Sequence, residues 1–365
     1  MYDLFVSYAT SDGREIAKAV SEHFRKRFLL TSFVAELAPI THDSVDQKIR
    51  EALSASRRVL VIFTSNAAAS PWVSGEIVMA SEMGKDLIVC RHAGVERRNL
   101  PVRLQSMQDI AFTDADSLLR ELTDKVEWGI PLVIPAAGRS GGLHPLTMGM
   151  PKILLPVGDR PILHHIIDRA NKAPGVFSKI IVITGKKNFG MIEHYAGLKP
   201  SEITVECQKT SHDLLPLALK NFSFQTTFMI HYSDILIEGD FDWKDFLAQH
   251  KNFRRRFNAI GTLMTSSNYK LPVGRIRADG KGVLTEFREK PENIQAVGYT
   301  INMAVSIFEP KFLEYVGEED QSLYGHTLGR AMESSEKFCI YEHDNWRHVQ
   351  TLSDWYEAQK DYLRT

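Results

Sequence analysis

The chain has 365 residues, enough for two or three domains that each bury their own core. Apolar residues make up 44% and charged residues 24%, which is ordinary for a globular protein. The formal net charge of −1 provides no basic field, and no apolar run approaches the ~20 residues that span a bilayer, so neither nucleic acid nor a membrane is an expected partner.

The first third of the chain alternates short strands with amphipathic helices. Apolar residues recur every four positions from Ile16 to Phe24, which predicts a helix that Ser11 or Asp12 caps. Residues 59–64 are continuously apolar, as expected of a strand buried on both faces of a parallel sheet. The other predicted elements are strands at 3–8, 32–37, 87–90 and 109–112, and helices at 44–56, 72–83 and 114–126.

The pattern restarts after a short connector near residues 127–130. A strand at 131–135 leads into a glycine-rich turn at 136–142. A helix at 160–171 and buried strands at 179–184 and 227–232 follow. The predicted fold is therefore α/β in two domains: a flavodoxin-like parallel sheet at residues 1–127 and a Rossmann-like mixed α/β domain at residues 131–365.

Three cysteines, Cys90, Cys207 and Cys339, are sparse and lack a C-x-x-C spacing. This pattern argues against a disulfide framework and for a reducing compartment. The sequence begins directly with a predicted strand and shows no signal peptide. We therefore expect a cytoplasmic protein.

Trp72 and Glu76 are one helical turn apart near the start of a predicted helix, so both side chains lie on one face. An indole plate beside a carboxylate suits a nicotinamide riboside, because cleavage of its glycosidic bond creates a cationic ribosyl centre that a carboxylate stabilises. The alternative interpretation is structural: Trp72 anchors a core and Glu76 is a solvated helix residue.

The segment S-P-W-V-S-G-E-I-V-M-A-S-E-M-G-K-D-L-I-V at residues 70–89, with Y-D-L-F-V-S-Y at residues 2–8, resembles the TIR domains that hydrolyse NAD⁺, including bacterial defence effectors. The resemblance implies NAD⁺ as substrate, Glu76 as the catalytic residue, Trp72 shaping the pocket, and Ser7 and Tyr8 lining it. Two features depart from the family: Ala9 replaces a common basic residue, and the loop at 38–44 lacks the usual glycine.

The glycine-rich turn at 136–142 lies in P-A-A-G-R-S-G-G-L-H-P-L-T-M-G-M-P-K, residues 135–152. A glycine loop between a strand and a helix presents backbone N–H groups to phosphates. The segment resembles the signature of sugar-1-phosphate nucleotidyltransferases, and this implies that Gly138, Arg139 and Gly141 cradle a nucleotide or sugar phosphate.

Further positions match that family. The resemblance implies that Lys152 neutralises phosphate, Gln208 reads the base, and Asp234 binds Mg²⁺. In the E-K-P motif, Glu289 would hold the sugar and Lys290 its phosphate.

Three chemical positions differ from the family. Gly142 replaces the arginine that clamps the triphosphate, and residues 213–215 replace the G-T-A segment beside the base. His348 stands where the family has its second metal carboxylate. Imidazole is a poor ligand for Mg²⁺, so Asp234 with His348 makes a weak candidate metal site.

Two interpretations of the second domain follow, an active transferase with altered specificity or a non-catalytic ligand sensor and oligomerisation scaffold. We predict that the TIR domain cleaves NAD⁺ at the nicotinamide–ribose bond in bacterial immunity or signalling. In this view the chain self-associates through both domains and the second domain binds a nucleotide or sugar phosphate. The alternative is an active sugar-1-phosphate nucleotidyltransferase whose TIR domain is an assembly module.

Overall fold

The computed structural model describes residues 2–35, 45–138, 141–210, 215–222, 224–268, 274–289 and 300–362. It divides the chain into two compact units, Met1–Trp128 and Gly129–Thr365. The predicted loop at 38–44, Arg139 and Lys290 lie outside the described residues.

Unit 1 contains a parallel sheet with the strand order β2-β1-β3-β4-β5 among its described residues. This arrangement confirms the predicted parallel sheet at the N-terminus. The strands are β1 (Tyr2–Tyr8), β2 (Ser32–Phe33), β3 (Ser56–Phe63), β4 (Asp86–His92) and β5 (Asp109–Phe112). The helices are α1 (Thr10–Phe28), α2 (Val45–Ser54), α3 (Ser65–Ala68), α4 (Pro71–Glu82), α5 (Val102–Gln105) and α6 (Ala115–Lys125).

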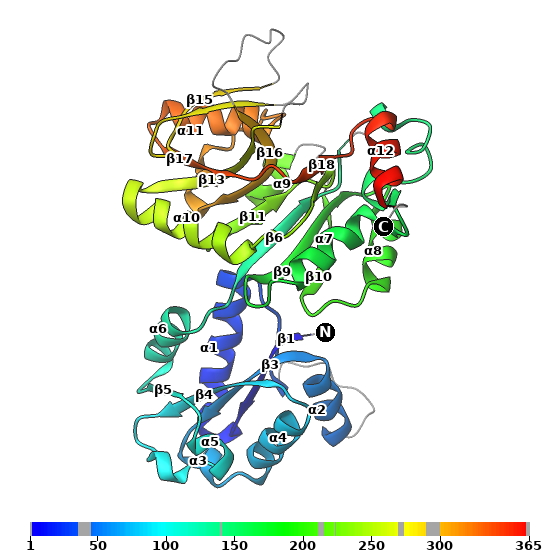
Figure 1. Ribbon diagram of the computed structural model, residues 1–365. Coiled ribbons are helices and arrows are strands. Elements are labelled where there is room, and N and C mark those ends of the chain that lie inside the picture. Colours follow the sequence, from blue (N-terminus) through cyan, green and yellow to red (C-terminus); the bar gives the residue numbers. More distant parts are fainter. Residues whose placement is uncertain are drawn as a thin grey trace. The chain divides into compact units, whose positions relative to one another are not determined.

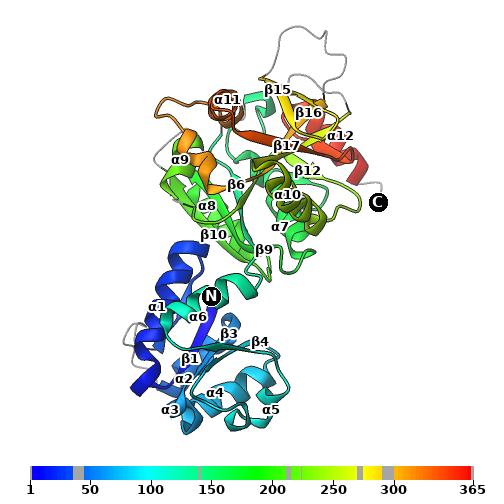
Figure 2. The same ribbon diagram turned by 90° about the vertical axis from the view of Figure 1, so that its left-hand side faces the viewer.

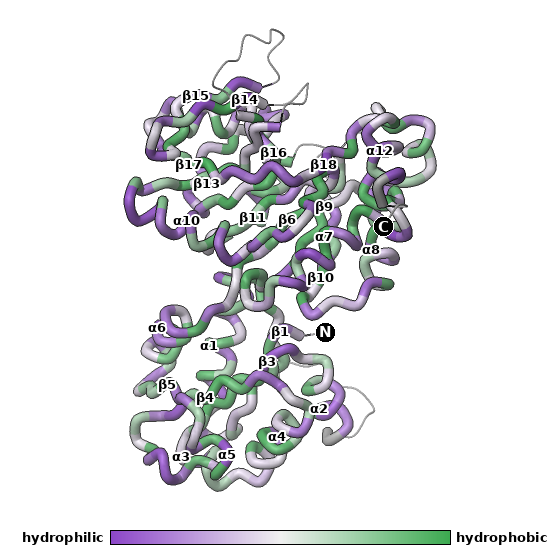
Figure 3. Tube along the Cα trace, viewed as in Figure 1, coloured by the Kyte–Doolittle hydropathy of each residue, from purple (hydrophilic) through white to green (hydrophobic). Residues whose placement is uncertain are grey.

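Helices cover both faces of this sheet (Figure 1). Apolar residues of α1 and α6 pack on one face, in a cluster that includes Leu4 and Val6 of β1. Residues of α2 and α4 pack on the other face with Phe5 of the same strand. Since neighbouring strand residues point to opposite faces, the two clusters use alternate positions of β1. The central strands are correspondingly apolar (Figure 3).

The predicted cap of α1 is wrong. The N-cap residue is Ala9, and no side chain accepts a hydrogen bond there. Asp12 instead lies inside the helix, where its carboxylate accepts hydrogen bonds from the Thr64 hydroxyl at 2.6 Å and the Asn66 amide at 3.0 Å. A tertiary contact with the start of α3 has therefore replaced the local capping role.

Unit 2 is built around a mixed sheet with the order β10-β9-β6-β11-β16-β13-β17. Strands β10, β9, β6 and β11 run parallel, and β16 runs antiparallel to β11. The strands along this order are β6 (Ile130–Pro135), β9 (Phe177–Gly185), β10 (Thr204–Thr210), β11 (Phe228–His231), β13 (Ala259–Ser266), β16 (Thr300–Phe308) and β17 (Lys337–Glu342). The shorter strands are β7 (Pro156–Val157), β8 (Arg160–Pro161), β12 (Ile235–Ile237), β14 (Arg275–Ala278), β15 (Leu284–Arg288) and β18 (Trp346–His348).

Two helices of unit 2 close one face of its sheet. Leu163 of α7 and Phe246 of α10 join Leu132 and Ile134 of β6 in one buried cluster (Figures 1 and 2). The helices are α7 (Ile162–Asn171), α8 (Phe189–Leu198), α9 (Leu215–Asn221), α10 (Trp243–Phe257), α11 (Gly329–Glu333) and α12 (Leu352–Tyr362). Across the described residues, no helix combines the length and apolar character that a bilayer-spanning helix requires.

Candidate functional sites

In unit 1, α4 places a carboxylate inside its apolar face. The helix starts at Pro71, and the hydroxyl of the preceding residue, Ser70, caps it by accepting a hydrogen bond from the Val73 amide. Glu76 lies on the buried side of the helix with 8% of its surface exposed. Its Oε2 accepts a hydrogen bond of 2.5 Å from the hydroxyl of Ser7, near the carboxyl end of β1.

This environment tunes the acidity of Glu76. Burial raises the pKa of its carboxyl to about 7, and the hydrogen bond from Ser7 opposes part of that rise. A carboxyl group with a pKa near 7 exists in both protonation states at physiological pH, which is characteristic of functional sites and uncommon for structural carboxylates.

The structural alternative for this helix pair is contradicted by the exposure of both residues. Trp72 is 58% exposed and anchors no core, whereas Glu76 is buried rather than solvated. Tyr8, by contrast, is not brought to Glu76. Its ring packs with the cluster under α1 and α6, on the opposite face of the sheet from Ser7.

The raised pKa of Glu76 predicts a pH-dependent stability. The protonated form favours the folded state, so its stabilising contribution is complete below the usual value of 4.5 and is lost as the pH rises through about 7. Glu76→Gln cannot ionise, and we expect it to be more stable than the wild type at pH 8 by on the order of 2 kcal/mol. At pH 4 the two should unfold alike, as followed by calorimetry. The exposed Glu82→Gln on the same helix is the matched control, and an equal gain in both variants would contradict this interpretation.

In unit 2, a cavity of about 580 Å³ opens at the carboxyl ends of the parallel strands. Ala136 and Gly138 after β6, Ile183 in β9, and Ser233 and Asp234 after β11 contribute to its wall. This edge is where open α/β sheets bind their ligands, and the volume suits a nucleotide-sized molecule.

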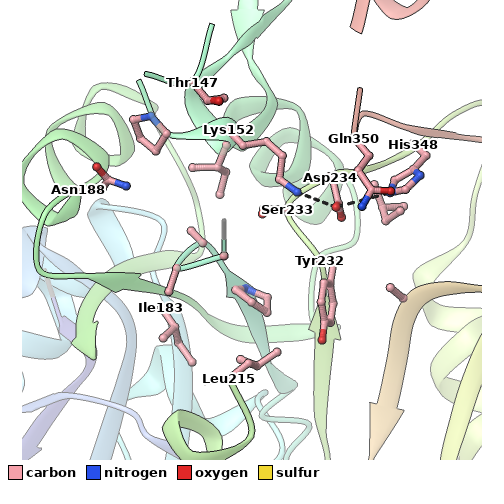
Figure 4. A pocket seen from close by; sticks show the side chains of 18 of the residues that line it. Thr147, Lys152, Ile183, Asn188, Leu215, Tyr232, Ser233, Asp234, His348 and Gln350 are labelled. Carbon is pink, nitrogen blue, oxygen red and sulfur yellow. Dashed lines mark hydrogen bonds and ion pairs between the residues drawn. The ribbon is translucent and has the colours of Figure 1, made fainter. Parts of the chain in front are cut away.

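Three charged or titratable side chains meet on one wall of this cavity (Figure 4). The Lys152 ammonium lies 2.7 Å from Oδ2 of Asp234, and Nε2 of His348 lies 3.5 Å from the same oxygen. Burial alone would raise the pKa of Asp234, but Lys152 and His348 outweigh it and hold that pKa well below its usual range. The pairing of β12 with β18, which sets Ile235 opposite His348, brings the imidazole to this position.

These residues do not fit Mg²⁺. That ion requires near-octahedral oxygen coordination, and Asp234 supplies a single carboxylate whose Oδ2 is already held by an ammonium. Among the residues that the structure describes, no three His, Cys, Asp or Glu side chains come together as a metal site.

The structure brings some of the predicted ligand-binding residues together and leaves others apart. Gly138, Lys152 and Glu289 line the large cavity, whereas Gly141 does not. Gln208 also lies outside it: its amide donates to Glu206 at 2.5 Å, and the residue lines a neighbouring cavity of about 130 Å³.

Gly142, at the position of the family's arginine, is packed against backbone. A Cβ atom added there would lie 2.7 Å from the carbonyl oxygen of Gln350. Gln350 lies two residues after His348, in the segment where the second family carboxylate is missing. Gly142 therefore lies against the segment that follows His348, and a side chain at residue 142 requires the backbone at Gln350 to move.

Two aromatic lining residues were missed by the sequence reasoning. Tyr232 and Tyr324 line the cavity with ring centroids 5.8 Å apart, and the Tyr324 hydroxyl is hydrogen-bonded to Ser306 at 3.0 Å. Burial raises the pKa of both phenols, so both stay neutral. Tyr232 could have been predicted to line the cavity, because it directly precedes Ser233 and Asp234 in the sequence. The short segment around Tyr324 contains no motif that would have indicated it.

Two family models match this chain. Residues 132–365 match the model described as nucleotidyl transferase, and residues 4–123 match the TIR domain model. Both matches fall on the segments whose motifs predicted them.

Two of the proteins that resemble this chain do so at low identity, over about half to two thirds of its length. A UTP–glucose-1-phosphate uridylyltransferase of Synechocystis is 22% identical over 63% of this chain and 63% of its own length. A mannose-1-phosphate guanylyltransferase regulatory subunit alpha of Dictyostelium discoideum is 23% identical over 51% of this chain and 46% of its own length. The chain thus spans less than two thirds of these relatives. The solved structure of a UDP-glucose pyrophosphorylase complexed with UDP-glucose matches this chain with a TM-score of 0.52 at 17% identity. The match covers 65% of this chain and 99% of the pyrophosphorylase chain, and it shows that the two share a fold.

Proposed function

Since the chain belongs to the nucleotidyl transferase family through residues 132–365 and carries a TIR domain at residues 4–123, we propose a division of labour between the two. The TIR domain cleaves NAD⁺ at the nicotinamide–ribose bond. The second domain binds a nucleotide or sugar phosphate without turning it over and organises self-association. The resemblance of the TIR segment to bacterial defence effectors supports a role in immunity or signalling.

The observation that carries the NAD⁺ proposal is the buried Glu76 held by Ser7. A carboxylate in a site shielded from water stabilises the positive charge that develops on the ribose far better than one in bulk water. The exposed indole of Trp72, one turn before Glu76, provides an aromatic surface on the same helix for the nicotinamide ring.

The proposal that the second domain is non-catalytic is supported by residues in and around its cavity that differ from the family's motifs. The Asp234 carboxylate is already paired with the Lys152 ammonium and lies beside His348, and Gly142 offers no cation for a triphosphate. Membership of the family does not by itself imply catalysis, since one matched relative is named as a regulatory subunit.

The second candidate function is an active sugar-1-phosphate nucleotidyltransferase. It is favoured by the matched relative named as a uridylyltransferase and by the cavity of about 580 Å³ that retains Lys152 and Glu289. In that case the TIR domain would serve as an assembly module.

Ligand binding by the second domain should be independent of a divalent cation, because an ammonium already neutralises Asp234. We expect UDP-glucose to bind equally well in EDTA and in millimolar Mg²⁺ by isothermal titration. Lys152→Met combined with Asp234→Asn removes both charges of the pair and avoids leaving a buried carboxylate alone. This double variant should weaken binding roughly tenfold, whereas Lys251→Ala on the exposed side of α10 should not. A strict requirement for Mg²⁺ would contradict the prediction.

Self-association is the expected organising role of the second domain. Domains held in one oligomer meet at a high effective concentration, which favours contacts between the attached TIR domains. Light scattering of the full chain at micromolar concentration should therefore give at least a dimer. A monomer under these conditions would remove the organising role and leave the NAD⁺ proposal to be tested on its own.

A further inference from the structure

The large cavity of unit 2 has an apolar end, away from the charged cluster of Lys152, Asp234 and His348. Its lining there includes Ile183 of β9, Leu215 of α9 and two methionines, Met148 and Met191. Met148 is 72% exposed and Met191 is 40% exposed, so both thioethers present apolar surface to the cavity. Since flexible thioether side chains pack well against aromatic rings, this end suits a flat ring such as a nucleobase.

The carboxamide of Asn188 is a polar group at this apolar end. Asn188 directly precedes α8, three residues before Met191, and lies on the opposite side of the cavity from His348 (Figure 4). It caps none of the N–H groups of α8, and within the described part of the chain no other group pairs with its carboxamide. Gln208, which was predicted to read the base, instead donates to Glu206 outside this cavity. Asn188 is therefore available to recognise a base here.

The chemistry of a carboxamide favours adenine among the purines. Its Oδ1 accepts a hydrogen bond from the 6-amino group of adenine while its Nδ2 donates to N7. Guanine and hypoxanthine present two acceptors at these positions, so Oδ1 would face another oxygen.

Lys187 supplies a cation next to this end. It directly precedes Asn188, lines the cavity, is exposed, and forms no ion pair with any carboxylate that the structure describes. Lys152 adds a second positive charge to the described lining, and Asp234 and Glu289 add two negative charges. These charges balance, which disfavours a free triphosphate and suits a diphosphate diester with one charge on each phosphate.

We propose, on the basis of the NAD⁺ cleavage proposed above, that this cavity binds ADP-ribose and makes the second domain a receptor for the product of the TIR domain. Hydrolysis breaks the bond between the nicotinamide nitrogen and the ribose, adds a hydroxyl group from water to the ribose, and releases neutral nicotinamide and a proton. The product joins adenine, a diphosphate and a sugar. Adenine lies at Asn188 and the methionines, the diphosphate lies at Lys187, and the ribose lies at the polar end, where Tyr232 and Glu289 line the cavity.

The test is an isothermal titration of the full chain carrying Glu76→Gln, so that ADP-ribose is added directly and none is formed. We expect saturable binding that Asn188→Leu and Lys187→Met each weaken roughly tenfold. IDP-ribose, whose base is hypoxanthine, should bind roughly tenfold more weakly than ADP-ribose, and Asn188→Leu should abolish that difference. Asn252→Leu and Lys251→Met, at exposed positions of α10, are the matched controls and should leave binding unchanged.

Because Asn188 makes no capping hydrogen bond, its variant should keep the wild-type unfolding temperature. Three results would overturn the proposal: ADP-ribose binding that does not saturate, equally tight IDP-ribose binding, or NAD⁺ binding that Asn188→Leu weakens as much as it weakens ADP-ribose binding. Nicotinamide release by the wild type is measured separately. Release without ADP-ribose binding overturns the receptor alone, and binding without release overturns the cleavage that supplies its ligand.

Discussion

Glu76→Gln should reduce the release of nicotinamide from NAD⁺ by at least 10²–10³-fold, the usual effect of removing one preorganised electrostatic group. The variant keeps the size of the side chain and an oxygen for the Ser7 hydroxyl, so the fold should be unaffected. The measurement is chromatographic quantification of nicotinamide at micromolar protein. Glu82→Gln, exposed on the same helix, should retain full activity.

The pH profile provides a separate readout of the same carboxyl group. If the ionised form stabilises the ribosyl cation, activity should rise with pH through about 7, the pKa of Glu76. Ser7→Ala removes the hydrogen bond that lowers this pKa and should move the profile to higher pH. Undiminished nicotinamide release by Glu76→Gln, or no release by the unmodified chain, would contradict the assignment.

The placement of some candidate residues of unit 1 was predictable, because their sequence patterns are local or periodic. The spacing of Trp72 and Glu76 fixes their common helix face, and continuous apolar runs indicate strands of a parallel sheet. The contact between Ser7 and Glu76 spans 69 positions in the chain and depends on how α4 packs on β1, which no local pattern encodes. The expectation that Tyr8 lines the same pocket as Ser7 could have been avoided from the sequence, because the alternation of strand residues already predicts that the two side chains face opposite ways.

The second site depended more on tertiary structure. Motifs located Lys152, Asp234 and His348, but the ion pair of Lys152 with Asp234 joins residues 82 positions apart. The three-residue strands β12 and β18, whose pairing delivers His348, are too short for a periodic signal. The side chain of Gln208 points toward Glu206 because the two form a hydrogen bond. The match to the family's motif could not reveal this contact.

The unmodified chain should release negligible pyrophosphate with any common nucleoside triphosphate and hexose 1-phosphate. Transfer of a nucleotidyl group needs positive charge that offsets the triphosphate in the transition state, and here Gly142 supplies none. The Lys152 ammonium is engaged by Asp234, and His348 replaces a second carboxylate. Two such losses, each worth ~10²–10³ in rate, would compound. Steady turnover by the wild type that disappears in Asp234→Ala would establish the transferase candidate instead.

Restoring the family residues should fail for a steric reason. His348→Asp places a second carboxylate near Asp234 but adds no cation for the phosphates. Gly142→Arg adds the cation, yet even its Cβ would lie 2.7 Å from the Gln350 carbonyl oxygen. We expect Gly142→Arg, and equally Gly142→Ala, to destabilise unit 2 by about 1–3 kcal/mol, the common cost of overpacking. Thermal unfolding measures this loss, and Gly141→Ala, where an added Cβ meets nothing within 4 Å, is the matched control. A stable Gly142→Arg, His348→Asp double variant with pyrophosphate release would show that the backbone at Gln350 yields, and that the loss of catalysis is confined to these two side chains.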